Sequence, residues 1–185
     1  MYEISRDIER ILVGKEELED ICDRLARQIT EEYGDSPRDL VAVVVLKGSI
    51  MFATDLVRRI PRHVCLEFMK VSSYGAGTVS GGRINILLDL HRKDLSEKDI
   101  LIVEDIIDSG RTLSYLVSYL TLNGARSVRT VALLDKPSRR EVEYSPDYTG
   151  IEIPDEFVVG YGLDYAEKYR TLPYVGVLKP EIYSE

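Results

Sequence analysis

The chain has 185 residues, of which 44% are hydrophobic and 30% are charged. These are ordinary globular proportions, and the length suits one core better than two, which excludes a disordered chain and a fibrous repeat. The formal net charge of −8 opposes binding to nucleic acid or to an anionic membrane, but a small phosphorylated ligand could still be held by local charges.

The first third of the chain predicts a strand, a tight turn and a helix. Apolar residues recur with helical spacing over residues 16–32, which indicates an amphipathic helix. Residues 40–46 are apolar without alternation, as is typical of a parallel strand covered on both faces. A sharp exit at residues 47–49 leads into a second helical pattern over residues 52–60. This order is the beginning of a βαβ unit.

The middle third continues the alternation of strands and helices. Strands are predicted at residues 64–71 and 84–88, and the glycine-rich residues 72–82 between them predict a flexible loop. Residues 100–103 form another apolar strand. A helix over residues 113–120 then ends at Asn123-Gly124, and a strand follows at residues 128–134. The spacing of these last two strands fits a right-handed crossover.

The last third is less regular, with strands predicted at residues 157–161 and 174–178. Together the elements predict an α/β fold, a doubly wound and mostly parallel sheet flanked by helices. We expect one domain over residues 1–185, with its core at about residues 38–160. Terminal segments, about residues 1–15 and 150–185, are expected to form a small hood over the carboxyl ends of the strands.

Residues 100–112 carry the strongest chemical pattern, in which a strand, two adjacent acids and two apolar residues precede a small-residue turn into a helix. Ser109, Gly110 and Thr112 allow consecutive backbone N–H groups to point outward at a helix N-terminus, which favours an anion such as a 5-phosphate. Glu104 and Asp105 suit the vicinal hydroxyls of a ribose and the Mg²⁺ that accompanies a pyrophosphate. The implied ligand is a phosphorylated ribose.

Each half of this pattern has a purely structural explanation. The residues after Ile107 could form only a turn with an N-cap, and the two acids could be only a solvated strand end. The occurrence of both halves together, in register after one strand, favours a ligand site.

This segment resembles the phosphoribosyl pyrophosphate motif of the type I phosphoribosyltransferases, and the resemblance extends from Leu12 to Pro180. Within that family the chain resembles the bacterial hypoxanthine phosphoribosyltransferases. Ser109 and Arg111 stand where some members have threonine and lysine. The resemblance implies the family's fold with its hood and flexible loop, Mg²⁺ as cofactor, phosphoribosyl pyrophosphate and a purine base as substrates, and a homodimer or homotetramer.

The resemblance also implies which residues bind the sugar phosphates. Residues 108–112, Arg111 included, would hold the 5-phosphate, and Glu104 and Asp105 would hold the ribose and Mg²⁺. Residues that would bind the pyrophosphate lie in several segments: Lys47, Gly48, Ser73, Tyr74 and Arg170. In the family the peptide bond that corresponds to Leu46-Lys47 is cis, and the loop that begins at Ser73-Tyr74 closes over the reaction.

For the base, the resemblance implies four residues in the last third. Lys136 would donate a hydrogen bond to O6 of the purine, which selects a 6-oxo base over adenine because lysine only donates. Phe157 would stack on the base while the main chain of Val158 meets its edge, and Asp164 would face Mg²⁺. Without the resemblance Phe157 would be interpreted as a core residue. Arg139 and Arg140 are interpreted as solvated charges.

The implied reaction displaces pyrophosphate from C1 of the ribose by N9 of the purine. Asp108 is the candidate base that accepts the proton from N7. Two alternatives stay open. A regulator could keep the fold as a phosphoribosyl pyrophosphate sensor, although the chain has no basic helix for nucleic acid. The same enzyme class could instead prefer xanthine, guanine alone or a pyrimidine.

Localisation and cysteine usage complete the sequence-based expectations. No stretch approaches the roughly 20 apolar residues that cross a bilayer, and the first residues lack the features of a signal peptide, so a cytoplasmic protein without membrane contact is expected. Cys22 and Cys65 lack a Cys-x-x-Cys spacing and are expected to be reduced and buried. His63 and His91 are too far apart to suggest a zinc site.

Overall fold

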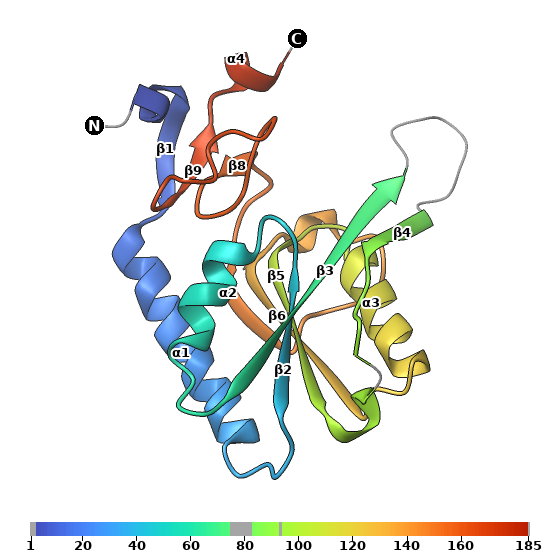
Figure 1. Ribbon diagram of the computed structural model, residues 1–185. Helices are drawn as coiled ribbons and strands as arrows, with labels where there is room; N and C mark the ends of the chain where they lie inside the picture. Colours follow the sequence, from blue (N-terminus) through green and yellow to red (C-terminus); the bar gives the residue numbers. More distant parts are fainter. Residues whose placement is uncertain (1–2, 75–82, 93, 185) are drawn as a thin grey trace.

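A computed structural model describes residues 3–74, 83–92 and 94–184 of the chain, and its strands form two sheets (Figure 1). The elements are, in chain order, η1 (Glu3–Asp7), β1 (Ile8–Val13), α1 (Lys15–Tyr33), β2 (Leu40–Val45), α2 (Ile50–Val57), β3 (Val64–Tyr74), β4 (Arg83–Leu88), η2 (Leu95–Glu97), β5 (Asp99–Ile107), α3 (Arg111–Leu122), β6 (Ser127–Asp135), η3 (Pro137–Arg139), β7 (Tyr148–Glu152), β8 (Val158–Val159), β9 (Val175–Leu178) and α4 (Pro180–Tyr183).

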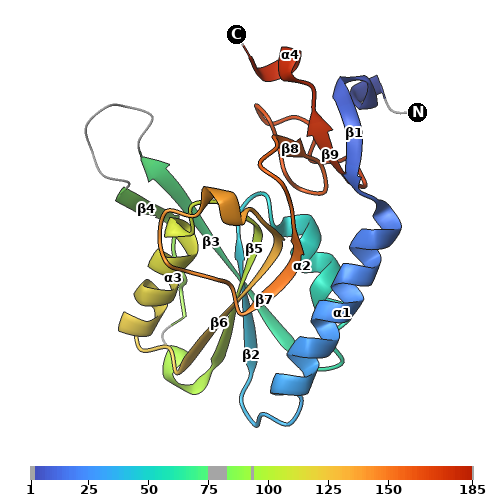
Figure 2. The ribbon, with the colours of Figure 1, turned by 180° about the vertical axis from the view of Figure 1, so that it is seen from behind.

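The larger sheet has six strands in the order β4-β3-β2-β5-β6-β7. Its neighbouring strands are parallel except β3 and β4, which are antiparallel. Helices α1 and α2 cover one face of this sheet and α3 covers the other, as Figure 2 shows from behind. This arrangement confirms the predicted doubly wound, mostly parallel α/β sheet.

Strand β2 shows why its apolar run does not alternate. Leu40, Ala42 and Val44 belong to the hydrophobic core under α1 and α2. Their neighbours Val41 and Val43 belong to the second core, under α3. Successive side chains of a strand point to opposite faces, so a central strand between two helical layers must be apolar at every position.

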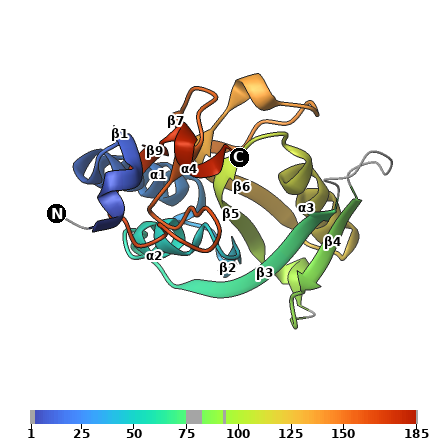
Figure 3. The same ribbon diagram turned by 90° about the horizontal axis from the view of Figure 1, so that it is seen from above.

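The hood is a three-stranded antiparallel sheet in the order β1-β9-β8. It joins the beginning of the chain to its end and lies over the carboxyl ends of the parallel strands (Figure 3). A third cluster of buried residues, Val159, Tyr169, Leu172 and Leu178, forms its interior.

The structure differs from the sequence-based expectations mainly at the strand ends and edges. Strand β5 continues through the acid pair to Ile107, because Glu104 and Ile107 still have register partners in β6. Strands β1 and β7 were not predicted. Cys22 is free and buried as expected, but Cys65 is exposed, so the prediction of a buried Cys65 was wrong. None of the helices in the described parts of the chain combines the length and apolar character needed to cross a membrane.

Candidate active site

Three cavities lie at the carboxyl ends of the parallel strands, with volumes of about 280, 280 and 330 Å³, and hood residues line the last two. Glu104 and Thr112 line both smaller cavities. Asp108 lines both the largest cavity and the one around the turn after β5. Leu163 lines both the largest cavity and the one around the turn after β2. Because they share walls, the three cavities form one branched cleft. This is the edge at which open α/β sheets bind ligands.

The first branch of the cleft surrounds the turn between β5 and α3. Asp108, Ser109, Gly110, Arg111 and Thr112 all line it, as the sequence predicts for a phosphate site. Gly110 has φ +79° and precedes the first residue of α3. This left-handed conformation suits glycine, and the backbone N–H groups at the start of a helix favour an anion.

Arg140 closes this turn from outside, which the sequence did not reveal. Its guanidinium donates to the backbone oxygen of Asp108 at 2.5 Å and pairs with the carboxylate of Asp135. Its side chain is only 16% exposed, and a β-carbon on Gly110 would lie 2.9 Å from its Cδ. The prediction that Arg140 is a solvated charge was therefore wrong. Arg139 does extend outward, 56% exposed and paired with Asp155.

The acid pair of β5 lies at the centre of the cleft. Burial raises the pKa of Glu104 well above its ordinary value, and the neighbouring charge of Asp105 adds to that rise. Burial likewise raises the pKa of Asp105 to about 6, although the backbone N–H of Ile106 donates to its carboxylate at 2.8 Å and Arg170 opposes the rise. The two carboxyl groups therefore favour a ligand that brings hydroxyl groups or positive charge.

The second branch of the cleft contains the turn after β2. Leu46, Lys47 and Gly48 line it, and the peptide bond between Leu46 and Lys47 is cis, as the resemblance implies. A β-carbon on Gly48 would lie 1.5 Å from Oδ2 of Asp105. A β-carbon on Gly162, which has φ +106°, would lie 2.0 Å from the backbone oxygen of Gly48. The turn is thus confined between the acid pair and the hood.

The cations of this branch are held by acids in the hood. Arg170 pairs with Asp164 at 2.8 Å and donates to the backbone oxygen of Gly162. Lys47 pairs with Glu167 at 3.0 Å, which the sequence did not single out. The structure therefore brings together Lys47 and Arg170, which are predicted to bind the pyrophosphate, and Asp164, which is predicted to face Mg²⁺. Glu167 is a surface acid 120 residues away from Lys47 along the chain, so no local pattern could have identified it.

Buried polar atoms without partners lie in this same branch. Among the described residues, Oε2 of Glu104 and Nε of Arg170 are buried and lack a hydrogen-bond partner. No group of three His, Cys, Asp or Glu in that part of the chain is placed to hold a metal ion alone. Mg²⁺ usually binds one or two carboxylates and completes its shell with water and substrate phosphates. One or two of Glu104, Asp105 and Asp164, which all line this branch, could supply such a partial site.

The third branch has the chemistry expected around the base. Lys136 is only 7% exposed, and its Nζ lies 3.7 Å from Oδ1 of Asp108. Phe157 and Val158 line the same cavity, and Phe157 is 38% exposed. The structure thus brings together three of the four predicted base-site residues, whereas Asp164 lines the second branch. Further lining residues were missed by the sequence analysis: Ile106, Leu163 and Tyr183.

The position of Ile106 could have been inferred from the sequence, because it follows the acid pair on a strand whose end reaches the cleft. Two predicted residues remain incompletely described. Ser73 and Tyr74 end β3, but their side chains, like the glycine-rich residues 75–82, lie outside the described residues.

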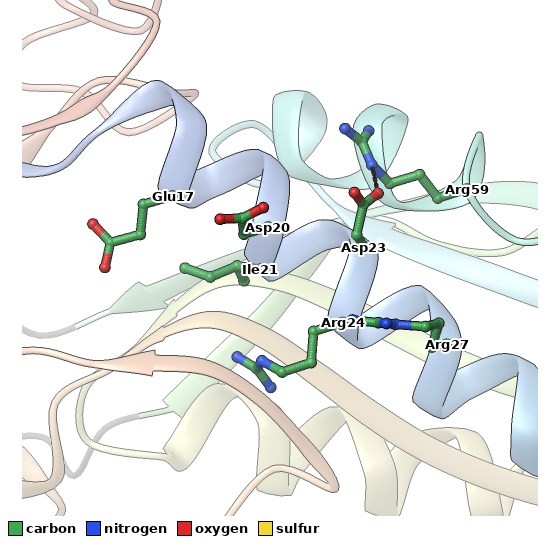
Figure 4. Close-up of a pocket in the computed structure, with 7 residues that line it drawn as sticks. All are labelled: Glu17, Asp20, Ile21, Asp23, Arg24, Arg27 and Arg59. Carbon is green, nitrogen blue, oxygen red and sulfur yellow. Dashed lines mark hydrogen bonds and ion pairs between the residues drawn. The ribbon is translucent and has the colours of Figure 1, made fainter.

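Another cavity, of about 640 Å³, lies on the outer side of α1 next to Arg59 (Figure 4). Three of its six charged lining residues are engaged within the protein. Arg59 pairs with Asp23 at 2.5 Å, and Arg24 donates to the backbone oxygens of Thr149 and Gly150. None of its lining residues borders the cleft, so this cavity is separate from it.

The sequence and the fold of this chain are similar to those of known proteins. The phosphoribosyl transferase domain family matches residues 12–166. A hypoxanthine-guanine phosphoribosyltransferase of Bacillus subtilis (strain 168) is 49% identical over 180 residues, which are 97% of this chain and 98% of that protein. A crystal structure of a hypoxanthine phosphoribosyltransferase from Staphylococcus aureus has a TM-score of 0.93 and 46% identity, and the match covers 100% of this chain and 98% of that chain.

A third relative is longer. A bifunctional protein TilS/HprT of Listeria monocytogenes is 52% identical over 182 residues, which are 98% of this chain but only 28% of that protein. The chain thus spans just over a quarter of this relative and nearly the whole length of the other two.

Proposed function

The chain belongs to the phosphoribosyl transferase domain family and has the type I fold of its relatives, and from this we propose that it is a purine-salvage phosphoribosyltransferase. It transfers the phosphoribosyl group of phosphoribosyl pyrophosphate to N9 of hypoxanthine, and also of guanine, and releases the nucleoside monophosphate and diphosphate. The observation that carries the proposal is the branched cleft, in which a phosphate turn, a confined cationic loop and a lysine-containing aromatic pocket adjoin.

In this reaction the N9–C1 bond forms as the bond from C1 to the pyrophosphate oxygen breaks. The base then has a surplus proton on N7, which Asp108 accepts. Asp108 fits this role because it lines both the phosphate and the base branches of the cleft and lies beside Lys136. Lys136 donates to O6, and Phe157 and Val158 hold the base.

The leaving pyrophosphate gains negative charge as the bond breaks. The backbone N–H groups of Lys47 and Gly48 and the guanidinium of Arg170 stabilise that charge. For their side chains to contact the pyrophosphate as well, Lys47 and Arg170 must exchange their acidic partners for phosphate oxygens. Ser73 and Tyr74 complete this set, and Glu167 is the partner that Lys47 releases.

Mg²⁺ is the proposed cofactor. One or two of Glu104, Asp105 and Asp164 would hold it, and it would neutralise charge on the pyrophosphate. Glu104 and Asp105 also bind the ribose hydroxyls, and residues 108–112 bind the 5-phosphate. We propose further that residues 1–185 act as one domain, that the enzyme works in the cytoplasm as a homodimer or homotetramer, and that it needs no nucleic acid or membrane.

A substrate panel tests the proposed function. Purified protein, Mg²⁺ and phosphoribosyl pyrophosphate are incubated with hypoxanthine, guanine, xanthine, adenine or uracil, and nucleotide and pyrophosphate release are followed. We expect fast turnover of hypoxanthine and none of adenine or uracil. Binding of phosphoribosyl pyrophosphate without turnover of any base would instead support a sensor, and exclusive use of xanthine or guanine would correct the base preference.

A further inference from the structure

Three aromatic rings meet at the wall of the base pocket, although they come from separate parts of the hood. Tyr183 stacks on Phe157, with ring centroids 4.6 Å apart and an interplanar angle of 21°. Tyr165 meets Phe157 edge-on at 5.6 Å and an angle of 88°. It also meets Tyr183 edge-on, at 6.5 Å and 69°. Offset stacked and edge-to-face pairs at these separations are the favourable arrangements of aromatic rings.

Backbone hydrogen bonds fix the position of Tyr183. The backbone N–H of Leu178 donates to the backbone oxygen of Phe157 at 2.9 Å, so β9 ends beside the residue whose ring Tyr183 covers. The N–H of Lys179 then donates to Asp7 at 2.9 Å, and that of Ser184 donates to Pro180 at 2.8 Å. The short helix α4 is thereby tied to both the purine segment and the beginning of the hood.

The stacked pair also borders the space that the base needs. Phe157 and Tyr183 both line the 330 Å³ cavity, together with Lys136 and Asp108. Phe157 is 38% exposed, so its ring lies at the surface of the hood and is not enclosed by the core. A ring at a surface loses rotational freedom when a ligand orders it, and this entropy opposes binding.

We propose that Tyr183 is a positioning residue for the purine base. By stacking on Phe157 in the absence of substrate, it holds that ring in the orientation that meets the base and lowers the entropic cost of binding. This inference rests on the proposed function and adds α4 to the base site. It concerns affinity for the base alone, because Tyr183 lines neither of the two cavities that contain the phosphate-binding segments.

The test compares Tyr183→Ala with Tyr183→Phe in the full chain, under steady-state turnover with each substrate varied in turn. A lost aromatic pair is expected to raise KM for hypoxanthine roughly 3- to 10-fold. KM for phosphoribosyl pyrophosphate and kcat should stay within twofold. Tyr183→Phe keeps the ring and should behave as the unsubstituted protein. Tyr115→Ala removes a ring from a stacked pair on α3, 6.1 Å from Tyr119, and serves as the matched control.

Three results would overturn the inference. KM for hypoxanthine could stay within twofold in Tyr183→Ala, both KM values could rise together as in a general disturbance, or KM for hypoxanthine could fall because Tyr183 competes with the base. If the unsubstituted protein turns over no base, the proposed function itself fails. Calorimetric titration of IMP into the same variants then still tests Tyr183, since weaker IMP binding by Tyr183→Ala than by Tyr183→Phe would support its role.

Discussion

Gly48 packs directly against the carboxylate of Asp105, so closely that a β-carbon on Gly48 would lie 1.5 Å from Oδ2. The closest approach between the turn after β2 and the acid pair of β5 therefore depends on the absence of a side chain. A substitution here must displace either the backbone that is to meet the pyrophosphate or the carboxylate that is to meet the ribose and cation.

The first prediction concerns this contact. Gly48→Ala should lower kcat/KM for phosphoribosyl pyrophosphate about 100-fold, because a displacement of about 1 Å in a positioned site has that effect. Steady-state kinetics with phosphoribosyl pyrophosphate varied measures it. Gly14→Ala is the matched control, because nothing lies within 4 Å of a β-carbon there, and its activity should stay within twofold. Equal activity of the two variants would show that the contact is not needed.

The second prediction concerns the proposed base. Asp108→Asn should lower kcat about 10²- to 10⁴-fold, the usual contribution of well-placed acid–base catalysis. Affinity for phosphoribosyl pyrophosphate should be retained, because the phosphate turn uses backbone N–H groups that this substitution leaves in place. Single-turnover kinetics and calorimetric binding of phosphoribosyl pyrophosphate separate the two effects. A turnover within a few-fold of the unsubstituted protein would exclude Asp108 as the base.

The phosphate turn and the acid pair could be predicted from sequence because each depends on neighbouring residues. Residues 104–112 are contiguous, and their carboxylates and small residues indicate their chemistry before any fold is known. The uninterrupted apolar run of β2 likewise predicts a central parallel strand, because a strand buried on both faces is apolar at every position.

Other parts of the site depend on contacts that no local pattern records. Arg140 contacts Asp108, which lies 32 residues away along the chain. Nothing in its sequence neighbourhood distinguishes it from a solvated charge. Tyr183 reaches Phe157 only because β9 pairs with β8. Glu167 pairs with Lys47 only because the fold brings these two distant residues together. Each is set by tertiary pairing, which sequence periodicity does not specify.

The third prediction concerns recognition of the base. Lys136→Met keeps most of the apolar stem but removes the donor, and should raise KM for hypoxanthine about 10- to 100-fold, since a hydrogen bond from a charged group contributes roughly 1.5–3 kcal/mol. Competition assays with adenine should show weaker discrimination. Lys15→Met on α1, where the lysine side chain is 70% exposed, is the control. Unchanged discrimination would mean that O6 is recognised elsewhere.

The fourth prediction concerns stability, at the opposite end of β5 from the acid pair. Burial raises the pKa of Asp99, but hydrogen bonds donated by Ser127, Ser36 and Arg38 outweigh it and hold that pKa below its ordinary value. The three donors lie 2.6, 2.8 and 3.1 Å from its oxygens. A carboxylate whose folded-state pKa is lowered stabilises the fold fully above its unfolded-state pKa, and that contribution is lost as pH falls through the folded-state value.

Asp99→Asn should therefore lower the free energy of unfolding at pH 7 by about 1–3 kcal/mol, because the donors lose a charged acceptor. The difference from the unsubstituted protein should hold from pH 7 to about 5 and narrow below about pH 4, near the ordinary aspartate pKa. Urea unfolding at several pH values measures it, with the exposed Asp35 replaced by Asn as the control. A difference that stays constant down to pH 3 would mean that Asp99 acts through its shape and packing, since its charge would then contribute nothing to folding.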